Sequence, residues 1–373
     1  MESLLKIIKL YEPEQLPSSK ELESFGEYAG VPDTAITEIL VFLSKVEEKI
    51  QKSLLDLRQE FLLKREIEFP ELKKIDLLLF KALLVLSCVN ELKTRHREIG
   101  IPEDITRETA SDIGIWIQDC HDKNGIWGLD NLEWLKNHFS CSLFRIGRLQ
   151  FILQRKNIFV HAFFNSATAK ITALTKPGIK LRNDGFVNLV NPDWESSYKD
   201  LQDRYIGNPV NPSGFVVKKT VVLLKGEWRK VLDSSDLLLD IHIPAGDSFA
   251  EDKVSNSLNS ARNIYSKFCP DEKISGFVCN SWMLDYQLTK ILKTDSNLVS
   301  FLKRFYLYPV VTDGSQTLER VFGSKDVDLT AFEPKTSLQK KCLEHLQEGK
   351  SFRNSGGFIF FDKNIDQPEN YAI

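Results

Sequence analysis

The first third of the chain carries apolar residues at helical spacing. Within residues 33–63 and 70–100 they recur three and four positions apart, which is the period of one face of a helix. Shorter patterns of the same kind follow at 105–125 and 130–139. These patterns predict an all-helical N-terminal domain over residues 1–139.

The pattern changes to that of strands near residue 140. Residues 142–155 and 156–165 are rich in aromatic and β-branched residues, and the Lys156-Asn157 pair between them predicts a hairpin turn. Residues 176–214 are dense in proline and glycine, which indicates an irregular insertion.

Strands and helices then alternate to the C-terminus. Strands are predicted at 237–243, 275–284, 306–311 and 356–361, and helices at 249–268, 296–305 and 336–349. Such alternation predicts a mixed β-sheet with helical crossovers. The fold class is therefore α+β, with a helical domain over 1–139 and a sheet domain over 140–373.

Composition narrows the class of protein. The 373 residues suffice for roughly two domains, and the net charge of −3 lacks the basic excess of a nucleic-acid binder. Six dispersed cysteines without a C-x-x-C pair favour reduced thiols. The N-terminal "MESLLKIIKLYEPEQLP" is unlike a signal peptide, and the apolar run 75–89 is interrupted by Lys81 and short for a membrane span. We expect a cytoplasmic protein with neither nucleic acid nor membrane as partner.

The order of several motifs resembles one family. The segments "SDIGIWIQDCHDKNGIWGL…WLKNHF", "LFRIGRLQF", "LDIHIPAG", "CNSWMLD", "SNLVSFLKRF", "RVFG" and "TSLQKKCLEHLQEG" span roughly residues 108–360. In this order they resemble bacterial acyltransferase-domain proteins, which pair a helical N-terminal domain with a GNAT-like C-terminal domain. The resemblance implies a fold similar to N-acyltransferases and an acyl-CoA, acetyl-CoA included, as co-substrate.

The same resemblance assigns a role to the stretch "LLLDIHIPAGDSFAED", residues 237–252. In the acetyltransferase architecture two parallel strands part, the pantetheine arm of the donor enters between them, and the following helix offers N–H groups to the pyrophosphate. The residues that would bind the cofactor are Ile243, Ala245, Gly246 and Ser248. The alternative is plain helix capping, because Ser248 and Glu251 have the spacing of a capping box and nearby acids repel a phosphate.

The candidate base lies at the end of the strand. Asp240 and His242 share one face of a strand that includes residues 237–243. A histidine oriented by a carboxylate takes up a proton near neutral pH, which an attacking amine must lose. A hydrogen-bonded histidine at a sheet edge is the structural alternative.

The next predicted strand supplies further candidates. Cys279 and Ser281 lie on one side of it and Trp282 on the other. Ser281 is a candidate proton donor to the leaving thiolate or substrate contact, and Cys279 with His242 a candidate nucleophile pair. A buried thiol is the ordinary alternative for Cys279, and Trp282 lies either in the core or in a pocket wall.

An arginine in "RIGRLQF" is the candidate anion contact. Taken as one strand, that segment places Arg148 and Gln150 on a common face, where Arg148 is positioned to bind a carboxylate or phosphate of the substrate. A solvated arginine is the alternative. The histidines have no spacing typical of a metal site, so no metal is expected.

These observations lead to one functional hypothesis and two alternatives. The first is acyl transfer from an acyl-CoA to a small-molecule or peptide amine, with the helical domain covering the acceptor or joining a homo-oligomer. The second is a binding or scaffold protein that kept the fold and lost the donor. The third is a hydrolase that uses Cys279 and His242.

Overall fold

The structure is a computed structural model that describes residues 15–373, so most of the N-terminal stretch tested for a signal peptide lies outside the described residues. The chain divides into two compact units. One unit combines the chain through Leu153 with His242–Ser248 and Ser255–Cys269, and the other combines Gln154–Ile241, Phe249–Val254 and Pro270–Ile373. The units interleave along the chain, so a domain boundary at residue 140 stays a prediction.

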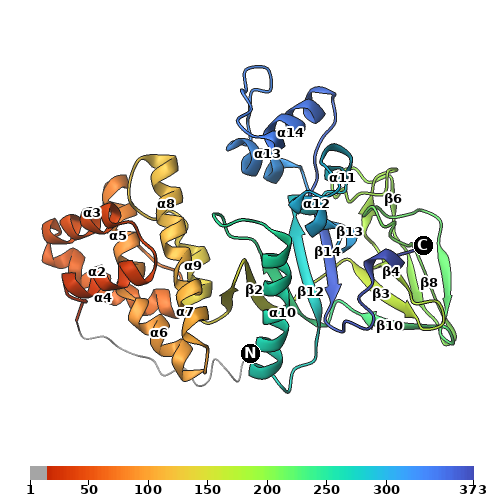
Figure 1. Cartoon of the computed structure of the whole chain (residues 1–373), viewed down its shortest axis with the longest axis horizontal. Helices are drawn as coiled ribbons and strands as arrows, with labels where there is room; N and C mark the ends of the chain where they lie inside the picture. Colours follow the sequence, from red (N-terminus) through yellow and green to blue (C-terminus); the bar gives the residue numbers. More distant parts are fainter. Residues whose placement is uncertain (1–14) are drawn as a thin grey trace. The chain divides into compact units, whose positions relative to one another are not determined.

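Helices make up the N-terminal region, as the sequence predicts (Figure 1). They are α2 (Ser19–Tyr28), α3 (Asp33–Lys45), α4 (Glu48–Leu62), α5 (Lys74–Ser87), α6 (Val89–Glu98), α7 (Glu103–Ala110), α8 (Asp112–Asn124) and α9 (Leu132–Phe139). The stretch 33–63 is two helices rather than one, because Val46 and Glu47 adopt extended backbone angles. All residues of 78–87 except Lys81 are buried, so α5 is a central helix of this core.

A hairpin follows the helices and corrects two predictions. Its strands β1 (Leu143–Ile146) and β2 (Leu149–Arg155) are antiparallel. Gly147 adopts φ +63° in the turn, a left-handed value that glycine accepts without strain. Arg148 therefore lies in a turn and not in a strand. The predicted hairpin at Lys156-Asn157 is wrong, since β3 (Val160–Asn165) pairs with other strands.

The main sheet of the second unit is mixed, as predicted. Its strands run in the order β11 (Leu237–His242), β12 (Ile274–Ser281), β14 (Ser355–Phe360) and β13 (Tyr306–Pro309). β11 and β12 are parallel, and the other neighbours are antiparallel. The helices are α10 (Glu251–Phe268), which belongs mostly to the first unit, and α11 (Leu288–Ile291), α12 (Asn297–Leu302), α13 (Ser315–Phe322) and α14 (Ser337–Gln347). A helical region followed by this sheet confirms the predicted α+β class.

Smaller sheets complete the second unit (Figure 1). One contains β10 (Trp228–Leu232), β3 and β4 (Lys170–Thr175), a second β5 (Lys180–Leu181) and β6 (Trp194–Glu195), and a third β7 (Tyr198–Asp200), β8 (Arg204–Gly207) and β9 (Val221–Leu224). The stretch 176–214 thus contains four short strands within its loops. Two 3-10 helices, η1 (Trp282–Leu284) and η2 (Pro368–Asn370), complete the described elements.

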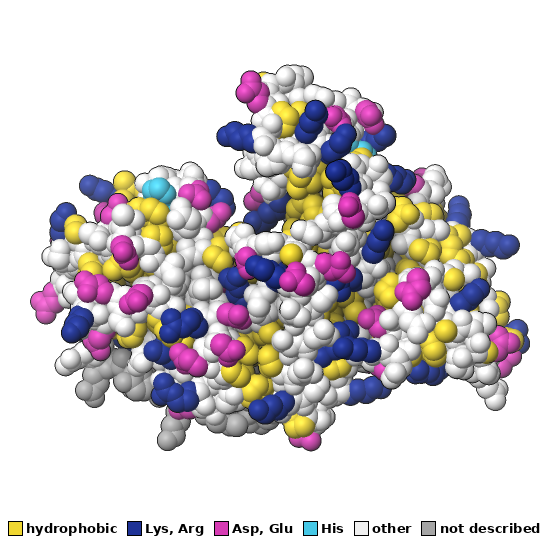
Figure 2. Space-filling model, viewed as in Figure 1, with side chains coloured by type: hydrophobic (Ala, Val, Ile, Leu, Met, Phe, Trp, Pro, Cys, Tyr) yellow, Lys and Arg dark blue, Asp and Glu magenta, His cyan; other side chains and the backbone are white. Residues whose placement is uncertain are grey.

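Basic and acidic side chains are interspersed over the face drawn in Figure 2. All six cysteines are free thiols. Within residues 15–373 no helix is both long and apolar enough to cross a membrane, and no group of three or more His, Cys, Asp or Glu side chains is arranged to hold a metal ion.

Candidate active site

β11 and β12 lie side by side as parallel strands of the second unit. Their register runs from Leu237 opposite Ile274 to Asp240 opposite Val278, and β12 continues for three residues to Ser281. The carboxyl ends of the two strands therefore lie at the same edge of the sheet. The parting of the strands that the acyl-CoA hypothesis requires stays a prediction.

The turn after β11 is not a helix cap. Helix α10 begins at Glu251, and Val254 N–H donates to the Ala250 carbonyl, which places the N-cap at Ala250. The predicted capping box of Ser248 and Glu251 is therefore wrong, because Ser248 lies two residues ahead of the N-cap. Residues 245–248 are exposed, and Gly246 adopts φ +102° with open space where a Cβ would point.

Arg148 supports this turn from the hairpin. Its Nη1 donates to the Pro244 carbonyl across 2.9 Å, and only 6% of the residue is exposed. Burial lowers the pKa of the guanidinium, as does repulsion from Arg145, while the Asp247 carboxylate raises it. In this position Arg148 holds the backbone of the turn, a role that differs from the solvated or substrate-facing arginine of the sequence analysis.

His242, the candidate base, contacts an aromatic side chain of the helical region. It is half-buried, and its ring centroid lies 4.9 Å from that of Trp134 on α9, with the two planes at 64°. This is an edge-to-face arrangement, which aromatic pairs favour because of their quadrupoles.

Trp134 belongs to a buried polar cluster centred on Asp112. The carboxylate oxygen Oδ2 of Asp112 accepts hydrogen bonds from the indole N–H groups of Trp116 at 3.1 Å and Trp134 at 3.2 Å. Nε2 of His138 lies 3.0 Å from the same oxygen. Only 1% of Asp112 is exposed, and burial alone raises the pKa of this carboxyl. The neighbouring His138, Gln150 and Trp116 side chains outweigh burial and lower the pKa, which keeps the carboxylate ionised.

Among the predicted substrate contacts, only Gln150 belongs to this cluster, and none of its other members was predicted. The sequence does contain a signal for these other members, because Asp112 and Trp116 on α8, like Trp134 and His138 on α9, are four residues apart. That spacing places both members of each pair on one helix face. As the first residue of α8, the Asp112 anion also faces the positive end of the helix dipole.

Asp240 has cationic and amide partners in the second unit. Its Oδ2 accepts hydrogen bonds from Nζ of Lys156 at 2.6 Å and Nε2 of Gln154 at 2.8 Å. Only 3% of Asp240 is exposed. The carboxylate that the sequence suggests as an orienting partner for His242 is thus also half of a partly buried ion pair.

The three candidates from β12 and η1 are all buried, and each has a packing or capping role. Cys279 is 1% exposed, and burial raises the pKa of its thiol, as does the Asp240 carboxylate. The Ser281 hydroxyl accepts a hydrogen bond from Met283 N–H at 3.1 Å and caps η1. Trp282 is 6% exposed and packs in an apolar cluster with Leu288 and Phe322.

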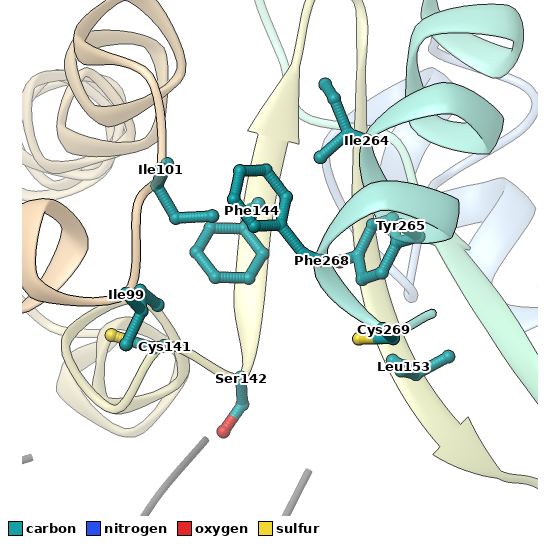
Figure 3. Close-up of a pocket in the computed structure, with 10 residues that line it drawn as sticks. All are labelled: Ile99, Ile101, Cys141, Ser142, Phe144, Leu153, Ile264, Tyr265, Phe268 and Cys269. Carbon is teal, nitrogen blue, oxygen red and sulfur yellow. The ribbon is translucent and has the colours of Figure 1, made fainter. Parts of the chain in front are cut away.

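A separate apolar pocket lies in the first unit (Figure 3). Its volume is about 30 Å³, and the rings of Phe144, Tyr265 and Phe268 crowd it. Tyr265 is fixed by a hydrogen bond from its hydroxyl to the Phe151 carbonyl. The lining residues include none of the candidate site residues, and they present almost only hydrocarbon, sulfur and ring surfaces. No histidine, aspartate or glutamate lines the pocket, so it does not contain the proposed base.

A helical region followed by a mixed sheet with a pair of parallel strands is consistent with a GNAT-like acyltransferase fold. The chain belongs to the family described as "GNAT-like C-terminal domain", whose model matches residues 143–359. Residues 20–141 match the model described as "N-acyltransferase N-terminal domain". The resemblance predicted from the sequence motifs is confirmed.

Solved structures with the same fold are acyltransferases. One, in complex with decanoyl-CoA and teicoplanin, is 19% identical with a TM-score of 0.66, and the match covers 97% of this chain and 94% of that one. Another, in complex with decanoyl-CoA, is 20% identical with a TM-score of 0.63 and coverages of 96% and 93%. A third, in complex with CoA and 10C-teicoplanin, is 18% identical with a TM-score of 0.63 and coverages of 97% and 94%. No curated protein sequence matches the chain significantly.

Proposed function

We propose that this protein transfers an acyl group from an acyl-CoA to an amine, by direct attack in a ternary complex. The amine nitrogen forms a bond to the acyl carbon while the carbon–sulfur bond of the thioester breaks. The imidazole of His242 takes the proton that the amine loses, and the resulting imidazolium gives a proton to the departing CoA thiolate. His242 is thus the catalytic base of the proposal.

One observation carries the proposal. β11, a parallel neighbour of β12, ends in a half-buried histidine, and an exposed turn then leads into α10. The fold family implies that the pantetheine arm of the donor binds at this end of the strand. We assign Ile243 and Ala245 to this arm, and Gly246 and Ser248 to the pyrophosphate.

The acids near the turn are the main electrostatic objection to a phosphate, and the structure lessens it. Asp247 interacts with the guanidinium of Arg148, whose pKa it raises against the effect of burial. In the second unit, Glu251 accepts a hydrogen bond from Nη2 of Arg304 at 3.3 Å. Asp247 and Glu251, two of the three acids at 247–252, thus each have a basic neighbour, so the turn is less repulsive to an anion than the sequence implies.

The neighbouring structures guide the choice of substrates. They contain decanoyl-CoA, octanoyl-CoA and teicoplanin. We therefore propose a medium-chain acyl-CoA as donor and an amine on a small molecule or a peptide as acceptor. Ser281 remains a proposed substrate contact. Cys279 is disfavoured as a nucleophile, because a buried thiol with a raised pKa supplies little thiolate.

Calorimetric titration of the purified protein with acetyl-CoA, octanoyl-CoA and decanoyl-CoA tests donor binding. We expect saturable binding of at least one acyl-CoA, with a dissociation constant in roughly the micromolar range typical of enzyme substrates. CoA without an acyl group and free octanoate serve as controls for the two halves of the donor. Heats that stay at the dilution level up to millimolar ligand would instead favour a scaffold protein that lost the donor.

A further inference from the structure

We propose that Asp112, acting through Trp134, positions the imidazole of His242. The inference rests on the proposed function, in which His242 is the base, and it adds a helical-region network that holds the base in place. All three residues belong to the first compact unit. Asp112 and Trp134 are positioning residues, since neither is placed against a reacting atom.

The indole of Trp134 is held at its polar edge. Its one polar atom, Nε1, donates to Oδ2 of Asp112 across 3.2 Å. The acceptor is 1% exposed, so breaking this bond leaves a buried carboxylate short of a donor that water cannot easily replace. The indole therefore has one favourable orientation.

The other part of the same indole contacts His242. The centroid distance of 4.9 Å and interplanar angle of 64° place one ring's edge against the face of the other. Rotation of the imidazole about its Cβ–Cγ bond changes this angle and loses the favourable electrostatics of the pair. A fixed indole thus selects among the ring orientations of His242.

Asp112 is suited to fix the indole because it joins two helices. It lies at the start of α8 and receives the N–H of Trp116 from its own helix. Trp134 and His138 approach the same oxygen from α9, at 3.2 and 3.0 Å. Both helices converge on one atom, so neither shifts without disturbing buried polar contacts.

The chemistry of the proposed reaction makes orientation matter. A general base must direct a ring nitrogen at the amine within hydrogen-bond distance, whereas donor binding depends on the turn and the strands. Loss of orientation therefore lowers kcat and leaves the KM for the acyl-CoA almost unchanged. A variant that only loosens the fold would lower its melting temperature and affect both constants.

Histidine NMR tests the positioning without any substrate. The protein is labelled at the histidine ring carbons, and the His242 signal is assigned by its absence in His242→Gln. We expect this signal to show the ring-current shift of a neighbouring indole in the wild type and to move toward the unstructured value in Trp134→Leu. Trp134→Phe keeps a ring but loses the N–H donor to Asp112, so its His242 signal should broaden and average. The variant Asp112→Asn should act in the same direction as Trp134→Phe.

The chain offers a matched control in Trp127, whose ring stacks on His121 at 3.7 Å. Trp127→Leu should shift the His121 signal and leave that of His242 unchanged. A His242 signal at the unstructured position in the wild type, or one that Trp134→Leu leaves in place, would overturn the proposal. Identical His242 signals in Trp134→Phe and the wild type would show that Asp112 has no part in positioning His242.

Kinetics provide the second arm. For release of CoA from octanoyl-CoA in the presence of an amine, Trp134→Phe should lower kcat about tenfold, with KM for octanoyl-CoA within a factor of two and Trp127→Leu unaffected. Equal kcat in Trp134→Phe and the wild type would overturn the positioning role. If the wild type itself releases no CoA, the proposed function fails, and the NMR result still decides whether Asp112 and Trp134 fix His242.

Discussion

Nζ of Lys156 donates to Oδ2 of Asp240 across 2.6 Å, and this ion pair neutralises the buried carboxylate of β11. Lys156 follows directly after β2, at the point where the sequence suggests a hairpin turn. Its role is to provide a cation for a strand residue more than eighty positions away. A buried charge needs such a partner, because desolvation otherwise costs several kcal/mol.

Removing that cation should destabilise the protein. We expect Lys156→Met to lower the free energy of unfolding by about 2–3 kcal/mol, since it leaves Asp240 buried without its cation. Urea unfolding followed by circular dichroism measures this loss. Lys123→Met is the control, because Lys123 forms an exposed pair with Asp119 and should change stability by less than about 0.5 kcal/mol. Equal losses of unfolding free energy in the two variants would show that the Lys156–Asp240 pair stabilises the fold no more than an exposed pair does.

Arg148 should act on donor binding through the turn. Its bond to the Pro244 carbonyl holds the backbone that we assign to the acyl-CoA. Arg148→Met should therefore weaken octanoyl-CoA binding by about tenfold in calorimetry, the effect of losing one charge-assisted hydrogen bond. Arg155 also bonds a backbone carbonyl, that of Ser235, so Arg155→Met is a control that should bind as the wild type does. An unchanged affinity of Arg148→Met for octanoyl-CoA would show that the turn is not part of the donor site.

Cys279 should be dispensable for turnover. Burial and the neighbouring Asp240 raise the pKa of its thiol, so little thiolate is present at neutral pH. We expect Cys279→Ala to keep kcat within about a factor of three, a small change for loss of a residue outside the catalytic machinery. Peptide mapping after iodoacetamide at pH 7 should leave Cys279 unmodified. Rapid alkylation of Cys279 that abolishes turnover would support the Cys–His hydrolase instead.

Stability should fall in mild acid because of His96. Burial lowers the pKa of this imidazole to about 3, and repulsion from His138 acts in the same direction. Between pH 6.5 and 3 the unfolded chain binds a proton at this histidine that the folded protein excludes. The contribution of His96 to the free energy of unfolding is therefore fully present above about pH 6.5. Below that pH the free energy of unfolding falls by up to about 1.4 kcal/mol per pH unit.

The variant His96→Gln isolates that contribution. Its unfolding free energy at pH 7 should be lower than that of the wild type, since Nδ1 of His96 lies 3.0 Å from the Thr106 hydroxyl and the ring packs on Phe144. Between pH 6.5 and 4, however, its loss of stability should be smaller. Parallel pH curves for the two proteins would contradict the assignment.

The sequence predicts the strand–helix alternation after residue 237 because the residues within each element are sufficient to indicate a strand or a helix. Strands β11, β12, β13 and β14 lie within a few positions of their predicted bounds. The pairing of β2 and β3 was wrongly predicted, since the aromatic and β-branched residues of both indicate strands but not which sheet each strand joins. That choice depends on tertiary burial. Gly147 could have indicated the turn, but the apolar pattern on both sides of it led to the prediction of one continuous strand.

The candidate site was predictable in part for the same reason. His242 is visible in sequence because it ends an apolar strand before a turn. The Asp112 cluster is not, because helical spacing pairs Asp112 with Trp116 and Trp134 with His138 but does not indicate that the two pairs meet. Their meeting depends on how α8 packs against α9. Ser248 illustrates the opposite error, since a local capping pattern was overridden by a helix that begins later.

Comparison of the wild type with His242→Gln in CoA release from decanoyl-CoA, over a panel of small amines and peptide amines, is the most direct test. Calorimetry on both proteins measures donor binding in parallel. We expect amine-dependent release by the wild type, a fall in kcat of about 100-fold or more in His242→Gln, and donor affinity within a factor of two. Full turnover by His242→Gln, or donor binding by neither protein, would contradict it.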